Sequence, residues 1–248
     1  MYKALRRAFL AFVLSACVTA AAQAAGCAVE GFTTVCHKGD RVLRVIKNTI
    51  SPSGRYGIAW QVPTDASVET WDDGSEISDT GSIKNVLVRL ADGAPVARLA
   101  GDHFGDHPRY NHREIVATWS PDSRYVAILN QSKCATDVSD VYRIADNGVT
   151  KPASLMPMCK SAARGEVTRR NGKGRDPYEY SLDVHSVGND GSIVARCALQ
   201  VIKEGDYFTL VVRAKAVAGG GGALKTRVIE SRLCKEEQGV CAGREPQD

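Results

Sequence analysis

Hydrophobic residues alternate with polar ones through most of the chain, and this period of two is typical of β-strands. The alternating stretches are short and are bounded by Gly, Asp, Asn and Pro, which favour turns. Ten stretches predict strands, at 42–46, 56–62, 83–90, 115–119, 125–130, 138–144, 180–184, 193–202, 207–217 and 224–231. Few long segments show the 3.6-residue period of a helix, so the pattern predicts an all-β protein. Four consecutive glycines at 219–222 are expected to connect the last two strands as a hairpin.

A weak internal repeat lies in the turns that precede three of these strands. Residues 51–60 (SPSGRYGIAW) align with residues 120–129 (SPDSRYVAIL), at a spacing of 69, and residues 189–195 (NDGSIVA) are a fainter copy. In each copy Pro, Asp, Ser or Gly forms a tight turn directly before an apolar strand.

These residues resemble the blade repeats of TolB-type and WD-like β-propellers of the bacterial envelope, in which a Ser-Pro-Asp-Gly turn precedes an inner strand. The resemblance covers only 50–60, 119–129 and 189–195. Its spacing is longer than the ~40 to 50 residues of a usual blade, and a complete propeller has at least about four blades. The resemblance implies a propeller-like fold, complete or divergent, and a β-sandwich is the alternative.

The first 25 residues have the features of an export signal. A basic start precedes an apolar run that continues in small residues to residue 25. Residues 22–24 (Ala-Gln-Ala) fit a signal peptidase site, whereas residues 14–17 (Leu-Ser-Ala-Cys) resemble a lipobox. The sequence therefore predicts a periplasmic or secreted protein, with a lipoprotein anchored through Cys17 as the alternative.

The composition fits one folded domain, predicted to span 26–248 after the leader at 1–25. The chain has 248 residues, 44% hydrophobic, and a formal net charge of +4. Without Lys3, Arg6 and Arg7 of the leader, 29 basic and 28 acidic side chains remain. This balance excludes nucleic acid as the main partner, because counterion-release binding requires a strongly basic face. No later stretch approaches the ~18 apolar residues of a membrane-spanning helix.

The cysteines are expected to form disulfides, because an exported chain meets an oxidising compartment. Pairing neighbours along the sequence predicts three bonds: Cys27 with Cys36, Cys134 with Cys159, and Cys234 with Cys241. Cys197 alternates with apolar residues of a predicted strand, so we expect it to be a buried free thiol. The absence of a Cys-x-x-Cys motif argues against a thioredoxin-like or four-cysteine zinc site.

A segment between two predicted strands concentrates groups that bind metals. Residues 101–114 contain three of the five histidines, His103, His107 and His112, together with three carboxylates. Imidazole and carboxylate are ligands that zinc accepts, so these histidines are candidate zinc ligands, and no other cofactor is expected. The His-Glu-x-x-His motif is absent. The alternative is a polar surface loop with solvated histidines.

A second segment, 160–175, carries six basic residues against one glutamate, and three glycines. We interpret it as a mobile basic loop in which Arg169, Arg170, Lys173 and Arg175 contact a partner. That partner would be an acidic protein surface or an anionic envelope polymer. The alternative is a solvated excursion that contacts no partner.

No nucleophile elbow, Walker loop or dinucleotide fingerprint occurs in the sequence. The function we expect is therefore binding without catalysis, by an exported propeller-like protein that contacts another protein or envelope component through loops on one face. One alternative is a metal-dependent periplasmic hydrolase that uses His103, His107 and His112. Another is an inhibitor or immunity protein that blocks an envelope-acting toxin or hydrolase.

Overall fold

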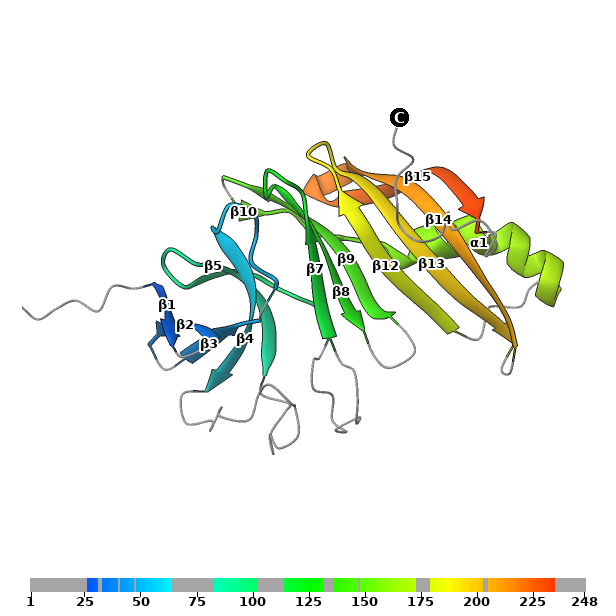
Figure 1. The fold of residues 1–248 in the computed structure, drawn as a ribbon. Coiled ribbons are helices and arrows are strands. Elements are labelled where there is room, and N and C mark those ends of the chain that lie inside the picture. The colour runs from blue at the N-terminus through cyan, green and yellow to red at the C-terminus, as the bar shows by residue number, and fades with distance from the viewer. Residues whose placement is uncertain are drawn as a thin grey trace, which may run out of the picture.

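The computed structural model describes residues 26–30, 33–39, 41–46, 48–63, 83–101, 114–131, 136–146, 148–172, 179–202 and 205–234. The strands of this part of the chain form three antiparallel sheets, which follow one another along the sequence (Figure 1). Most strands pair with their neighbours in sequence, as in a β-meander.

The first sheet contains, in spatial order, β1 (Cys27–Glu30), β2 (Thr33–Lys38), β3 (Arg41–Val45), β4 (Tyr56–Pro63), β5 (Lys84–Arg89) and β6 (Ala94–Arg98). The second contains β7 (Glu114–Trp119), β8 (Tyr125–Gln131), β9 (Thr136–Ala145) and β10 (Gly148–Val149), with β11 (Ala153–Ser154) also paired to β9. The third contains β12 (Glu179–Val187), β13 (Ser192–Ile202), β14 (Gly205–Ala218) and β15 (Leu224–Leu233).

The prediction of an all-β protein is confirmed, and each of the ten predicted strands is present with ends shifted by a few residues. The glycines at 219–222 connect β14 to β15, as expected. The hydrophobic pattern does not predict β1, β2, β6, β10 or β11. Their sequences, CAVE, TTVCHK, APVAR, GV and AS, do not alternate regularly between apolar and polar residues.

The second sheet lies between the other two, and both of its faces are buried. On β8, Val126 and Ile128 belong to an apolar cluster shared with Ile58 of the first sheet. Ala127 lies between these two residues in sequence and Leu129 follows Ile128. Both belong to a cluster shared with the third sheet. Because successive side chains of a strand point to opposite faces, this unbroken apolar run contributes to two cores at once.

The first sheet has a separate apolar cluster on its other face, which includes Leu43, Ala59 and Val88. The sheet brings its first strand close to the turn after β5, where the Cys27 N–H donates to the carbonyl oxygen of Leu90 over 3.1 Å. Cys27 is bonded to Cys36. This predicted disulfide is confirmed, and it joins residues directly opposite each other in β1 and β2.

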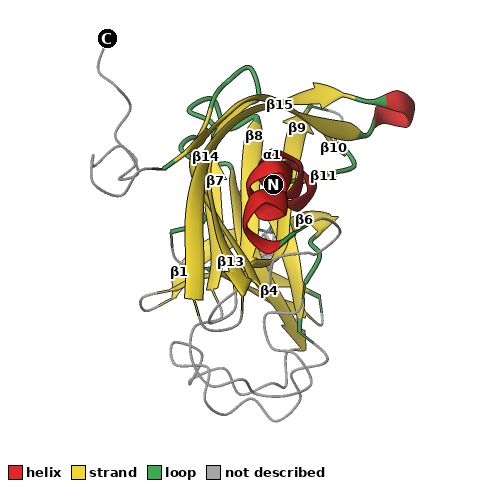
Figure 2. Ribbon diagram, turned by 90° about the vertical axis from the view of Figure 1, so that its right-hand side faces the viewer, coloured by secondary structure: helices red, strands yellow, loops and turns green. Residues whose placement is uncertain are grey.

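The helix α1 (Met156–Asn171) lies between the second and third sheets. In Figure 2 it stands between β13 and β14 on one side and β9 and β11 on the other. Cys159, Ala163 and Val167 recur every fourth residue and are buried, and Pro157 occupies the first turn, where proline is tolerated. The prediction of a mobile loop is therefore wrong up to residue 171, because its small apolar residues form one stripe along a helix.

A disulfide fixes this helix to the third sheet. Cys159 of α1 is bonded to Cys197 of β13, 38 residues away in sequence. The predicted pairing of Cys134 with Cys159 and the predicted free thiol at Cys197 are both wrong, because packing of α1 on β13 brings Cys159 and Cys197 together. Cys234 is also disulfide-bonded; Cys134 and Cys241 lie outside the described residues. The two disulfides between described residues are compatible with an oxidising compartment.

The first two copies of the sequence repeat form turns of the same construction. In each, the side-chain hydroxyl of the leading serine accepts the N–H of the tyrosine that begins the next strand. The two bonds are Ser51 to Tyr56 at 3.1 Å and Ser120 to Tyr125 at 2.9 Å. Ser123 has a positive φ of 62°, a conformation that glycine adopts more readily.

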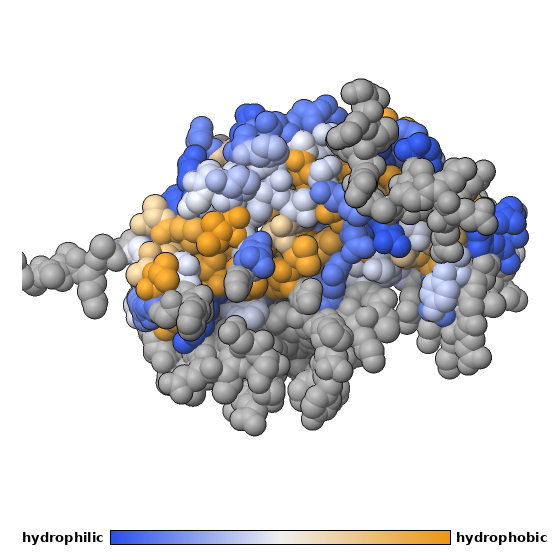
Figure 3. Space-filling view, in the orientation of Figure 1, coloured by the Kyte–Doolittle hydropathy of each residue, from blue (hydrophilic) through white to orange (hydrophobic). Residues whose placement is uncertain are grey.

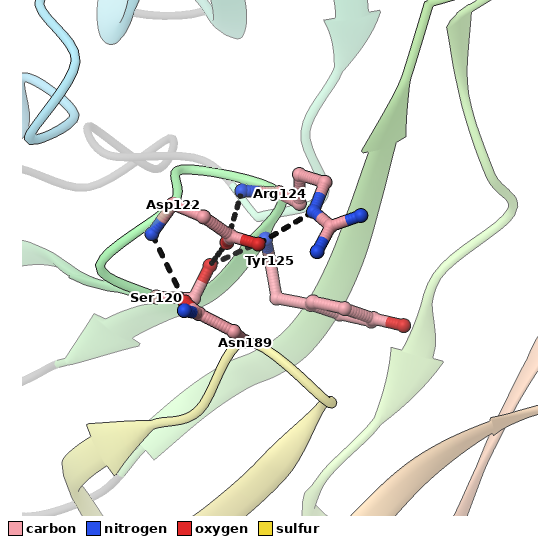
Figure 4. A network of polar contacts seen from close by, with 5 residues as sticks. All are labelled: Ser120, Asp122, Arg124, Tyr125 and Asn189. Atoms are coloured by element: carbon pink, nitrogen blue, oxygen red, sulfur yellow. Dashed lines mark hydrogen bonds and ion pairs between the residues drawn. The ribbon is translucent and has the colours of Figure 1, made fainter.

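The three repeated turns are bonded to one another. The Ser53 N–H donates to Oγ of Ser123, and the Asp122 N–H donates to Oδ1 of Asn189, each over 3.0 Å. Figure 4 shows the second of these bonds, together with the Ser120 and Arg124 contacts that hold the Asp122 carboxylate. The repeat therefore marks the places where one sheet contacts the next.

The described strands form no closed barrel and no closed propeller. Within the described ranges, no helix is long and apolar enough to cross a membrane.

Candidate functional site

The three candidate zinc ligands, His103, His107 and His112, lie outside the described residues, so zinc binding there stays a prediction. Within the part of the chain that the structure describes, no group of three or more His, Cys, Asp or Glu side chains could hold a metal ion.

Two of the predicted basic contact residues lie at the end of α1 and are paired with an acid. Nε of Arg169 lies 3.0 Å from Oε2 of Glu166, and Arg170 donates to Oε1 of the same carboxylate. Hydrogen bonds from Arg169 and then Arg170 lower the pKa of Glu166 to about 2. The guanidinium of Arg170 also stacks over Phe208, 4.8 Å from the ring centre. These two cations are thus already engaged within the chain, while Lys173 and Arg175 lie outside the described residues.

Described elements cover one face of the third sheet and leave the other without cover. Leu182, Cys197 and Leu210 are directly opposite one another on β12, β13 and β14, and all three belong to the cluster that packs against α1 and the second sheet. The residues between them point the other way, because side chains alternate along a strand. No other described element covers that outer face (Figures 1 and 2).

The outer face is rich in cations. Strand register places Arg196 between Asp183 and Val211, and Arg213 beside Glu230. We call the charged residues on the outward side of β13, β14 and β15 the outer basic face. They are Arg196, Arg213, Lys215, Lys225, Arg227, Glu230 and Arg232. All seven are exposed or partly exposed. On β13, β14 and β15 six cations thus share this side of the sheet with one carboxylate, Glu230, and β12 adds Asp183 opposite Arg196.

Described residues neutralise only part of this positive charge. Nζ of Lys215 lies 2.7 Å from Oδ2 of Asp190, and its hydrogen bond lowers the pKa of that carboxyl below the ordinary value. Nε of Arg232 lies 3.3 Å from Oε1 of Glu230. The remaining four cations of the face form no ion pair with a described residue: Arg196, Arg213, Lys225 and Arg227.

One cation has a buried donor that no described residue accepts from. Nε of Arg196 is shielded from solvent and has no hydrogen-bond acceptor among the described residues. An unsatisfied buried donor is costly, and a carboxylate or carbonyl oxygen from a partner would satisfy it. Val194, Val211 and Val217 lie on the same face between the cations. Figure 3 shows this mixture over the third sheet, where hydrophilic residues are interspersed with apolar ones.

Sequence reasoning missed this face because its cations are spread over residues 196–232 in three strands. A signal was present, since Arg196 and Arg213 occupy the polar positions of alternating runs. The charges become one surface only when the strand register aligns them.

No protein-family model and no curated protein sequence matches the chain. Among solved structures, a match is titled "KlHsv2 with loop 6CD replaced by a Gly-Ser linker". It is 9% identical, with 83% of this chain and 70% of that chain covered, and a TM-score of 0.24. A similarity this low supports no inference about fold or function.

Proposed function

We propose that this protein is an exported binding protein of the bacterial envelope, which docks an acidic surface of another protein on its outer basic face. The observation that carries the proposal is the outer face of the third sheet, which no described element covers and on which four cations have no ionic partner among the described residues. Arginine beside apolar residues is typical of protein interfaces, in which Arg is enriched and Lys depleted. An acidic partner would neutralise the face and accept from Arg196.

The size of the face suits such a partner. Its four strands have 9, 11, 14 and 10 residues. With strands ~4.8 Å apart and ~3.3 Å per residue, they present roughly 700 Å². A standard interface takes about 800 Å² from each partner. The sheet alone therefore supplies most of the contact area that a specific complex needs.

The proposal includes a propeller-like arrangement and a periplasmic location. Three sheets stack in sequence and their repeated turns are bonded to each other, which favours blade-like packing over a two-layer sandwich. The predicted leader and the two disulfides support export.

The test is a charge reversal on the face. Wild type and an Arg213→Glu/Arg227→Glu variant are immobilised and incubated with periplasmic extract, and bound proteins are eluted with salt. The matched control is Arg143→Glu/Arg164→Glu, which makes the same change in net charge at exposed positions elsewhere. Circular dichroism checks that all three proteins keep their β-structure.

We expect wild type and control to capture the same acidic protein, and the face variant to capture at least about tenfold less. Capture should also weaken with salt, because exposed charges are screened beyond about 8 Å at physiological ionic strength. Equal capture by the face variant, or equal loss in the control, contradicts the proposal. An inhibitor of an envelope enzyme is a special case, recognised when the captured protein is an enzyme that loses activity in the complex.

The hydrolase alternative has a separate test. Zinc measured in the purified protein should be stoichiometric and should be lost from a His103→Ala/His107→Ala variant if those residues hold a metal. Metal-free wild-type protein with full stability would exclude a resident zinc site in that segment.

A further inference from the structure

A small polar cavity lies between the first and second sheets, away from the outer basic face. Asn85 of β5 and Asn130 of β8 contribute side-chain amides to its lining, and Leu99 and Ile128 contribute apolar walls. The volume of the cavity is about 10 Å³, which is enough for one group of the size of a water molecule.

Each of the two amides has one atom that no described residue bonds. Asn85 and Asn130 are each only 3% exposed. Oδ1 of Asn85 and Nδ2 of Asn130 are shielded from solvent and have no partner among the described residues. One is an acceptor and the other a donor, so a single group that both donates and accepts would satisfy them together.

The main chain beside the cavity keeps the two amides in place. Nδ2 of Asn85 donates to the carbonyl oxygen of Gly101 over 2.7 Å. A Cβ added to Gly101, whose φ is +82°, would lie 3.0 Å from Nδ2 of Asn130 and 3.0 Å from a methyl of Val138. Glycine is thus required here both by conformation and by the closeness of Asn130.

Asp140 and Tyr142 complete the polar lining. Burial raises the pKa of both groups. Among the side chains that line the cavity, the two amides hold the buried polar atoms that have no partner among the described residues.

Next to the cavity lies a crevice whose described charged residues are both cations. It has a volume of about 320 Å³ and is lined in part by Lys84, Arg98 and Gly101. It shares Asn85, Leu99 and Ala100 with the cavity. Neither Lys84 nor Arg98 forms an ion pair with a described residue.

We propose that this site binds a small anion that carries a hydroxyl group, such as a sugar phosphate or a hydroxy acid. The hydroxyl enters the cavity, donates to Oδ1 of Asn85 and accepts from Nδ2 of Asn130. The phosphate or carboxylate lies in the crevice against Lys84 and Arg98. Each part of the ligand thus meets a group that has no partner within the described chain.

Isothermal titration calorimetry with matched probes tests the two halves of the ligand. Glycerol 3-phosphate carries both groups, propyl phosphate lacks the hydroxyls, and glycerol lacks the anion. Lactate and propionate form the same comparison for a carboxylate. We expect a hydroxyl-bearing anion to bind at least tenfold more tightly than its partner without the hydroxyl, and glycerol not to bind measurably.

Variants assign the binding to this site. Lys84→Gln/Arg98→Gln should weaken binding of the hydroxyl-bearing anion at least tenfold, whereas Arg143→Gln/Lys151→Gln should leave it unchanged. Asn130→Leu should remove the preference for the hydroxyl. If Asn130→Leu does not fold, as judged by circular dichroism, the two double variants, both at surface positions, decide alone.

Failure of both glycerol 3-phosphate and lactate to bind would overturn the proposal. Equal affinity for propyl phosphate and glycerol 3-phosphate would also overturn it, since it would mean that water satisfies the amides and the anion binds only at the surface. The site is independent of the outer basic face, so the Arg213→Glu/Arg227→Glu variant should bind the small anion as wild type does.

Discussion

Removing the Cys159–Cys197 disulfide should cost more stability than removing the Cys27–Cys36 disulfide. The Cys159–Cys197 bond cross-links α1 to β13 of the third sheet, and both cysteines are almost fully buried, at 1% and 0% exposure. A 16-residue helix is marginal on its own, so α1 depends on this attachment and on its apolar stripe.

The expected magnitude follows from the length of chain that each disulfide closes. The chain-entropy relation gives about 3.9 kcal/mol for a separation of 38 residues, as between Cys159 and Cys197. It gives about 2.6 kcal/mol for the separation of 9 between Cys27 and Cys36. The Cys159→Ala/Cys197→Ala variant should therefore lose about 1.3 kcal/mol more free energy of unfolding than Cys27→Ala/Cys36→Ala. The smaller side chains also leave a buried gap, which adds to the loss.

Urea denaturation followed by far-ultraviolet circular dichroism measures both losses against wild type. Hydrogen exchange on the same proteins should show that amides of α1 lose protection in the Cys159→Ala/Cys197→Ala variant but keep it in the Cys27→Ala/Cys36→Ala variant. A loss below about 1 kcal/mol for the Cys159→Ala/Cys197→Ala variant, or the reverse order of the two variants, would refute the reasoning. Digestion without reduction should also yield a linked pair of peptides containing Cys159 and Cys197.

Three further predictions concern single side chains. Ser123→Ala removes the acceptor of the Ser53 N–H but keeps a side chain at a positive φ, whereas Ser123→Gly removes the same acceptor and relieves the backbone strain. Thermal unfolding should therefore show the glycine variant to be more stable than the alanine variant by about 1 kcal/mol. Equal or reversed stabilities would contradict this. Since burial raises the pKa of Asp140, this group stabilises the folded state below the unfolded pKa, and the stabilisation is lost as pH rises through the folded pKa. The side chain of Asp140→Asn does not titrate, so the urea midpoint of this variant should rise relative to that of wild type between pH 3 and pH 7. The pKa of Glu166 is instead lowered to about 2, so this group stabilises the folded state above about pH 4.5, and the stabilisation is lost as pH falls toward 2. Glu166→Gln should abolish this loss, which is about 0.5–1 kcal/mol of the free energy of unfolding. If stability falls in acid as steeply in the variant as in wild type, the pairing of Glu166 with Arg169 and Arg170 is contradicted.

The strands were predictable because their signal is local. Ile193, Ala195, Cys197 and Leu199 alternate with polar or partly exposed residues, and this period fixes both the strand and the face that is buried. The helix was not predicted, since its buried residues are mostly small and its surface is strongly basic. The stripe of Cys159, Ala163 and Val167 identifies it only once a helix is considered.

The candidate sites were less accessible than the strands. The outer basic face needs the pairing of Arg196, Arg213 and Arg227 across three strands. The polar cavity needs Asn85 and Asn130, 45 residues apart in sequence, to approach the same glycine. Neither asparagine stands out in the sequence, because each occupies a position in a strand where it reads as an ordinary polar residue.

The sequence by itself determined the all-β class, the strand positions, the repeated turns and the Cys27–Cys36 bond, because these depend on side-chain alternation and on residues close along the chain. The tertiary structure alone decided the Cys159–Cys197 bond, the bonding of one repeated turn to the next, and the cationic face. Each of these depends on which sheet packs on which, and packing brings together residues whose separation in sequence carries no record of the contact.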